Sequence, residues 1–165
     1  MKIWLQEKIG NPELFTGRKK EMAFFLNWID RIKQELSQST AILSRRKTGK
    51  TALLQRLFNV IFEKNDGVVP FYFEIRESDR WLGDFAEDFF LSFLYQYIAF
   101  KTRNSEYLSP LRSRTLEQAY EISGKENMDF FKDPIRGMQI RAAREQGDMM
   151  WDIARDLPRG IAEHT

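Results

Sequence analysis

Cysteine is absent from the 165-residue sequence, and histidine occurs once, at His164. The absence of cysteine excludes disulfides, thiolate zinc sites and cysteine nucleophiles. A single histidine leaves too few ligands for a histidine-based metal site, and Ser-His-Asp chemistry would depend on a residue that we expect in an exposed tail. Several common catalytic schemes are therefore excluded.

Long hydrophobic runs are also absent. The N-terminal residues MKIWLQEKIG contain no apolar signal-peptide segment. The most apolar stretch, FFLSFLYQYIAF at 89–100, is shorter than the roughly 20 residues that a membrane-spanning helix needs. Hydrophobic residues make up 42% of the chain and aromatic residues 14%, which is enough for the core of a globular domain. We therefore expect a cytoplasmic, globular protein without membrane contact.

The charge is unevenly distributed, although the whole chain has a net charge of only +2. Between Gly17 and Arg56 there are ten basic and three acidic residues, a balance of +7. The rest of the chain is therefore acidic on balance. A concentrated positive potential of this kind favours a phosphate-bearing or polyanionic partner for the first third of the chain.

Hydrophobic periodicity predicts alternating helices and strands in the first half of the chain. Apolar residues at helical spacing predict a helix from Arg18 to Ser37 and a second from Lys50 to about Asn65. The apolar run at 40–44 and the β-branched and aromatic run at 68–75 predict buried strands. A strand-helix-strand unit of this size implies parallel strands and an α/β layer.

The remainder is predicted to be helical. We expect helices at 81–101, 112–123 and 139–157, with a flexible connection at 101–114. Two parallel strands cannot form a self-sufficient sheet. We therefore expect either further strands or an incomplete chain, organised as 1–80 and a helical segment at 81–165.

The segment that suggests chemistry is SRRKTGKT, between the first predicted strand and the second predicted helix. The P-loop pattern G-x-x-x-x-G-K-[ST] is matched at Gly49, Lys50 and Thr51 and departs from it at Ser44. A strand, a loop and a helix in this order would wrap backbone N–H groups and a positive helix end around a phosphate. The candidate nucleotide-binding residues in the loop are Ser44, Arg45, Arg46, Lys47, Thr48, Gly49, Lys50 and Thr51.

This interpretation assigns ATP and Mg²⁺ as the cofactors. The Lys50 ammonium would contact the β and γ phosphates, and the Thr51 hydroxyl would be the Mg²⁺ ligand. The alternative is that Gly-Lys-Thr is a chance tripeptide that opens an ordinary helix. Ser44 in place of the first glycine would weaken binding, because glycine adopts the required backbone geometry more easily.

The sequence resembles a known family at Phe15-Thr16-Gly17-Arg18, followed by Glu21, and at SRRKTGKTALLQRL. These segments are similar to AAA+ and STAND-type ATPases of the archaeal ATPase group. The resemblance covers Phe15 to about Ile75. It implies a P-loop NTPase-like three-layer α/β core, with Gly17 and Arg18 near the adenine and ribose. The alternative for this box is a helix N-terminus capped by Thr16.

A hydrolysing member of that family also needs a Walker B strand ending in Asp-Glu, and none is found in this sequence. The resemblance therefore implies that the chain stops before Walker B, after a helical insertion, and that hydrolysis requires segments outside it. Glu77 or Asp79 could help to position Mg²⁺, although solvated charges at a strand exit are the simpler interpretation. Catalytic residues are therefore unassigned.

The segment from Trp81 to Phe100 has eight aromatic residues in twenty. Core packing is the simplest explanation, and a protein interface or self-association surface is the alternative. Stacking of Tyr95 and Tyr97 on nucleobases is disfavoured, because no basic residues are interleaved with them.

Three functions are compatible with these features. We favour ATP binding by an AAA+ or STAND-type ATPase module. The first alternative is a non-catalytic interaction or regulatory fragment with a degenerate loop. The second is binding of a nucleic-acid backbone by the basic segment, which would show a steep salt dependence.

Overall fold

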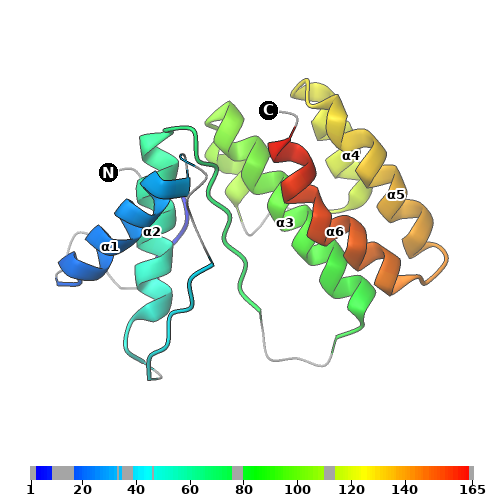
Figure 1. Cartoon of the computed structure of the whole chain (residues 1–165). Helices are drawn as coiled ribbons and strands as arrows, with labels where there is room; N and C mark the ends of the chain where they lie inside the picture. Colours follow the sequence, from blue (N-terminus) through cyan, green and yellow to red (C-terminus); the bar gives the residue numbers. More distant parts are fainter. Residues whose placement is uncertain are drawn as a thin grey trace. The chain divides into compact units, whose positions relative to one another are not determined.

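The computed structural model describes residues 3–8, 17–32, 34, 39–45, 47–75, 80–109 and 114–163. Within these ranges the chain forms helices joined by turns and extended segments, as Figure 1 shows. Contacts divide the chain into two units, Met1–Tyr72 and Phe73–Thr165. The boundary that we predicted after residue 80 lies within the second unit.

The first unit contains two α-helices, α1 (Lys19–Ile32) and α2 (Lys50–Lys64). Phe25 and Ile29 of α1 form a buried cluster with Leu53 and Leu57 of α2. These residues lie on the apolar stripes that predicted both helices. The predicted helix from Arg18 extends to Ser37, whereas α1 ends at Ile32, and residues 33 and 35–38 lie outside the described residues.

The predicted α/β fold is wrong. Within the described part of the chain there is no strand, and the runs at 40–44 and 68–75 are extended without forming a ladder. Leu43 is 93% exposed and Ile75 is 74% exposed, so neither is buried in the way that the strand prediction required. Residues 40–44 lie in the first unit, while 68–75 cross into the second.

The physical reason is that an extended segment becomes a strand only when neighbouring segments satisfy its backbone groups. The described residues therefore do not form the three-layer core implied by the resemblance. The predicted P-loop fold depends on that core, and so do the Walker A strand-loop-helix unit and the AAA+ or STAND ATPase fold. These predictions are therefore wrong for the same reason. In the described part of the chain, the loop before α2 therefore follows an extended segment that is not part of a sheet.

The second unit is built from four α-helices and two short 3₁₀ helices, counted over its described residues. The α-helices are α3 (Leu82–Thr102), α4 (Leu116–Lys125), α5 (Lys132–Ala142) and α6 (Gly147–Ala162), and the 3₁₀ helices are η2 (Ser105–Leu108) and η3 (Asp129–Phe131). Helix α3 packs along α6, and α5 packs against both α4 and α6, as Figure 1 shows.

The predicted helix at 81–101 is confirmed by α3, whose second half is buried on almost every side. Phe90, Leu94 and Ile98 are completely buried. Phe85 and Phe89, nearer the start of α3, pack their rings against Phe73 and Trp151 at centroid distances of 5.1 to 5.6 Å. The aromatic residues of α3 therefore form the core of the second unit.

The other two helix predictions had the wrong bounds. The helix predicted at 112–123 is α4, which begins at Leu116 because the Thr115 hydroxyl accepts a hydrogen bond from the Gln118 N–H at 3.3 Å. The helix predicted at 139–157 is interrupted between α5 and α6. Glu145 adopts a left-handed conformation there, with φ of 54°, and thereby ends α5. Glycine usually occupies such a position, so the sequence carried no clear stop signal.

In the portion of the chain that is described, none of the helices combines the length and the apolar character needed to cross a lipid bilayer.

Candidate functional site

The loop before α2 is closed by its own polar groups. The Thr48 hydroxyl lies 2.9 Å from both the Ser44 Oγ and the Arg45 carbonyl oxygen. Two residues adopt left-handed backbone conformations, Lys47 with φ of 61° and Gly49 with φ of 80°. Glycine adopts this conformation without strain, which explains Gly49 directly before the helix. The loop therefore curls back on itself before α2 begins.

Helix α2 starts with backbone donors that its own cap does not satisfy. The first N–H groups of an α-helix have no acceptor within the helix. Gly49 occupies the N-cap position and provides no side-chain acceptor. Among the described α-helices, α2 is also the one without an acidic residue in its first turn. The positive end of its dipole is therefore left available to an anion.

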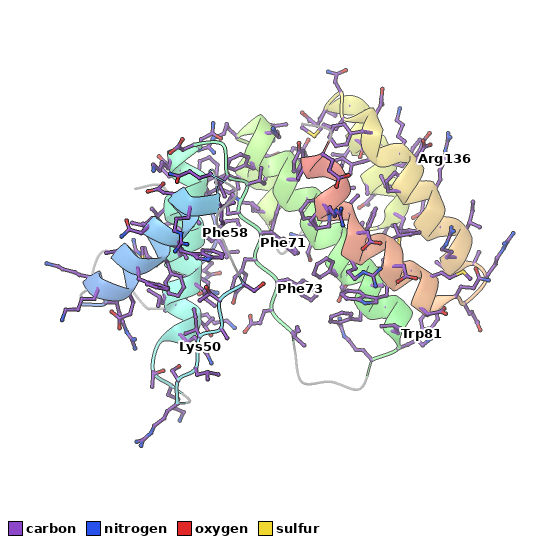
Figure 2. The ribbon with its side chains drawn as sticks, viewed as in Figure 1. Lys50, Phe58, Phe71, Phe73, Trp81 and Arg136 are labelled. Atoms are coloured by element: carbon purple, nitrogen blue, oxygen red, sulfur yellow. The ribbon has the colours of Figure 1, made fainter. Side chains whose placement is uncertain are left out.

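A pocket of about 440 Å³ lies at this helix end. Among its described lining residues, four are basic and none is acidic. The lining residues are Lys8, Ser44, Arg45, Lys47, Thr48, Gly49, Lys50, Thr51 and Ala52. Figure 2 shows Lys50 at the start of α2, with Phe58 farther along the same helix. The arrangement combines positive side chains, helix N–H groups and two threonine hydroxyls, which together suit a phosphate-bearing anion.

A second pocket of about 520 Å³ lies on the α1 side of the loop. It shares Ser44, Thr48 and Lys50 with the first pocket. The other lining residues come from the start of α1 and the residue before it, from the extended segment at 40–43 and from α2: Arg18, Lys20, Glu21, Phe24, Phe25, Thr40, Ala41, Ile42, Leu43 and Leu53. The lining is thus partly apolar and partly aromatic. A ligand with both a phosphate and a ring system would therefore find complementary surfaces on the two sides of the loop.

Arg18 connects the start of α1 to the loop. Its guanidinium donates a hydrogen bond to the Thr48 carbonyl oxygen and forms an ion pair of 2.9 Å with Glu21. The pKa of Glu21 is lowered, first by a hydrogen bond from its own backbone N–H and then by the Arg18 side chain. Arg18 therefore contacts the loop that the sequence assigned to nucleotide binding, and it lines the second pocket.

The remaining predicted site residues either line neither of these two pockets or lie outside the described residues. Gly17 has a left-handed backbone, with φ of 83°, and is not among the residues that line these two pockets. Arg46, Phe15 and Thr16 lie outside the described residues, as do Glu77, Asp79 and His164. Their predicted roles are therefore neither supported nor opposed by the structure.

Lys8 was not predicted as a site residue. It belongs to the segment Trp4–Lys8, which hydrogen-bonds to a polar stripe on α2. The Trp4 indole N–H donates to Glu63 at 2.6 Å, the Trp4 backbone N–H donates to Asn59 at 2.9 Å, and the Lys8 backbone N–H donates to Gln55 at 2.7 Å. The segment therefore runs along α2 toward the N-terminal end of that helix.

The sequence contained a signal for this segment. Gln55, Asn59 and Glu63 recur every four residues on a helix that is otherwise largely apolar, and the structure buries Gln55 and Asn59 almost completely. Buried amides require hydrogen-bonding partners. A polar stripe on a buried helix face therefore indicates a backbone segment lying over it.

Thr51 is a weak candidate for holding Mg²⁺ by itself. Proteins usually bind Mg²⁺ through carboxylates together with substrate phosphates. The residues that the structure describes around the loop pocket include Thr51 and no carboxylate. The described residues contain no cluster of three or more acidic, histidine or cysteine side chains suited to a metal ion. A metal ion at this loop would therefore be held mainly by the phosphates of a bound nucleotide.

The aromatic segment at 81–100 contributes mainly to the core. Tyr95 and Tyr97 are buried to 0% and 3% exposure, so they present no face for nucleobases to stack on. Trp81, directly before α3, is 46% exposed. Core packing, the simpler of the two interpretations, therefore accounts for most of these residues.

Comparison with known proteins adds no assignment, because no protein-family model, curated protein or solved structure matches this chain.

Proposed function

We propose that this protein binds ATP through the loop from Ser44 to Thr51. The observation that supports the proposal is the pocket at the N-terminus of α2, whose described lining residues include four basic ones and no acidic one. The phosphates would supply the negative charge that this helix end lacks. The choice of ATP among phosphate compounds rests on the local Gly49-Lys50-Thr51 pattern and on the partly aromatic second pocket beside the loop.

Each part of the loop has a separate role in this proposal. The N–H groups of the first turn of α2 donate to phosphate oxygens, and Lys50 contributes a charge-assisted hydrogen bond. Thr51 lies next to the phosphates, where its hydroxyl can join the coordination of a nucleotide-bound Mg²⁺. Arg18 holds the loop in place through the Thr48 carbonyl oxygen.

We propose binding without turnover by this chain alone. Phosphoryl transfer to water requires a group that orients or activates the water molecule. Since the loop pocket has no carboxylate among its described lining residues, such a group would have to come from another molecule or another part of the protein. Mg²⁺-dependent hydrolysis by the purified monomer would contradict this part of the proposal.

The test is a calorimetric titration of the purified chain with Mg·ATP at moderate salt. We expect micromolar binding that weakens by about tenfold or more in Lys50→Ala, because a hydrogen bond to a charged group contributes about 1.5 to 3 kcal/mol. Lys19→Ala is the matched control, because it removes the same charge from an exposed position on α1 outside both pockets. Equal affinity in Lys50→Ala and the unmodified chain would refute the proposal.

A second candidate function is binding to a nucleic-acid backbone. The exposure of Arg45 and Lys47 in a segment with a balance of +7 favours it. DNA affinity that falls steeply with salt and is unchanged by saturating ATP would support this alternative. Competition between ATP and DNA would instead indicate that both use the same loop.

A further inference from the structure

Lys8 reaches the loop pocket because of how the N-terminal segment is anchored. Asn59 is completely buried, and its side-chain amide contacts Trp4, Leu5 and Glu7. The Glu7 carboxylate, also buried, lies 3.1 Å from the Arg56 guanidinium. A buried amide and a buried carboxylate tolerate little displacement, since each would be left without its partners. The segment is therefore fixed on α2 up to the residue before Lys8.

The anchoring hydrogen bond of Lys8 uses its backbone. Its N–H donates to the Gln55 side chain at 2.7 Å, while the residue lines the pocket that also contains Lys50. Gln55 lies in the second turn of α2, and Lys50 lies at its start. Lys8 therefore lines the same pocket as Lys50 although it belongs to a segment distant in sequence from the loop.

We infer that Lys8 is a phosphate-binding residue and that the site selects polyphosphates over single phosphate groups. This inference rests on the proposed ATP binding. Basic residues from two separate segments, the N-terminal segment and the loop, line a pocket of about 440 Å³, which is far larger than one phosphate group. A chain of two or three phosphates can contact Lys8 and Lys50 together, whereas a single phosphate bound at the helix end satisfies Lys50 alone. The charge on Lys8 thus contributes most to ligands with several phosphates.

The experiment compares the unmodified chain with Lys8→Gln, using ATP, AMP, tripolyphosphate and inorganic phosphate in separate calorimetric titrations. We expect Lys8→Gln to weaken ATP and tripolyphosphate binding by about tenfold and to change AMP and inorganic phosphate binding by less than about twofold. The effect on tripolyphosphate shows that Lys8 acts on phosphates and not on the base or ribose. Lys8→Arg, which keeps the positive charge, should restore most of the affinity.

Two controls separate a contact between Lys8 and phosphate from changes in overall charge or in stability. Lys19→Gln removes the same charge from an exposed position in the same unit, so it reports the change in overall electrostatics. Thermal unfolding of Lys8→Gln is measured beside the titrations, so that a loss of affinity can be separated from a loss of stability; the substitution keeps the hydrogen bond to Gln55, which uses the Lys8 backbone.

The outcomes distinguish this inference from the proposal on which it rests. If the unmodified chain binds ATP and Lys50→Ala loses binding, but Lys8→Gln binds like the unmodified chain, the role of Lys8 is refuted and ATP binding stands. An equal loss for AMP and ATP in Lys8→Gln would also refute it, because polyphosphate selection would be absent. If the unmodified chain binds neither ATP nor tripolyphosphate, both the proposed function and the role of Lys8 are refuted.

Discussion

The side-chain amide of Asn59 pairs with both backbone polar groups of Leu5. The Asn59 Oδ1 accepts a hydrogen bond from the Leu5 N–H at 2.7 Å, and the Asn59 Nδ2 donates to the Leu5 carbonyl oxygen at 2.9 Å. The two residues are 54 positions apart in the sequence. The Asn59 side chain therefore makes the hydrogen bonds that a neighbouring strand would make to an extended segment in a sheet.

The first prediction concerns Asn59→Ala. The substitution leaves the backbone groups of Trp4 and Leu5 without their acceptor in a buried environment, so we expect the free energy of unfolding to fall by about 2 to 4 kcal/mol. Chemical denaturation of the purified variant measures this loss. Asn27→Ala, at an exposed position on α1, should change stability by less than about 0.5 kcal/mol. A loss no larger in Asn59→Ala than in this control would show that the N-terminal segment is not anchored by Asn59.

The sequence predicted the helices of this chain better than its strands. Apolar spacing located α1, α2 and α3. A helix forms its backbone hydrogen bonds within itself, so that the rest of the chain has to cover only its apolar face. The runs at 40–44 and 68–75 have strand-like composition, but a strand also needs partners that composition does not reveal. The exposed Leu43 and Ile75 show that these partners are missing from the described part of the chain.

The candidate site was predicted in part. The local pattern of Gly49, Lys50 and Thr51 located the loop, because a tight turn before a helix is encoded by neighbouring residues. Lys8 could not be found in this way, since its position depends on hydrogen bonds between segments about fifty residues apart. The stripe formed by Gln55, Asn59 and Glu63 was the available signal, and it indicates where a segment lies without identifying which one.

The second prediction concerns Arg18 as a residue that positions the loop. Its guanidinium donates to the Thr48 carbonyl oxygen, so Arg18→Gln should loosen the loop without removing a cation from the first pocket. We expect ATP affinity to fall by about three- to tenfold, a smaller loss than in Lys50→Ala. Glu21→Gln, which breaks the ion pair of Arg18 but leaves Thr48 in contact, serves as the control. An equal loss in the two variants would assign the effect to the ion pair instead of the loop contact.

The third prediction concerns the contact between the start of α3 and the start of α6. A Cβ added at Gly147 would lie 2.9 Å from the Gly83 backbone nitrogen and 3.4 Å from the Trp81 ring. Because backbone atoms cannot move aside cheaply, we expect Gly147→Ala to lower the free energy of unfolding by about 1 to 3 kcal/mol.

Gly160→Ala provides the matched control in the same helix. A Cβ at Gly160 would meet nothing within 4 Å, and alanine favours a helix over glycine by about 0.5 to 1 kcal/mol. The two alanine variants should therefore change the thermal midpoint in opposite directions. Stabilisation by both would mean that α3 and α6 do not approach each other closely at Gly83 and Gly147.

The last prediction concerns the pH dependence of stability at Glu87. The pKa of Glu87 is raised, because partial burial disfavours its charged form and the carboxylates of Glu117, Asp84 and Asp88 repel it. A carboxyl group with a raised pKa binds its proton more tightly in the folded chain than in the unfolded chain. Its contribution therefore favours folding below the ordinary glutamate pKa and is lost as the pH rises through the raised value.

Glu87→Gln removes this titration while keeping nearly the same shape. At neutral pH the variant should unfold at a higher temperature than the unmodified chain, and the difference should shrink as the pH is lowered to about 4, where Glu87 itself becomes protonated. Scanning calorimetry across this pH range measures both effects. Glu121→Gln, which removes a charge from an exposed position on α4, controls for the change in net charge. If Glu87 is disfavoured in its charged form, the stabilisation by Glu87→Gln must disappear once the Glu87 carboxyl is neutral. A stabilisation of equal size at every pH would therefore show that burial and repulsion do not disfavour the charged form of Glu87.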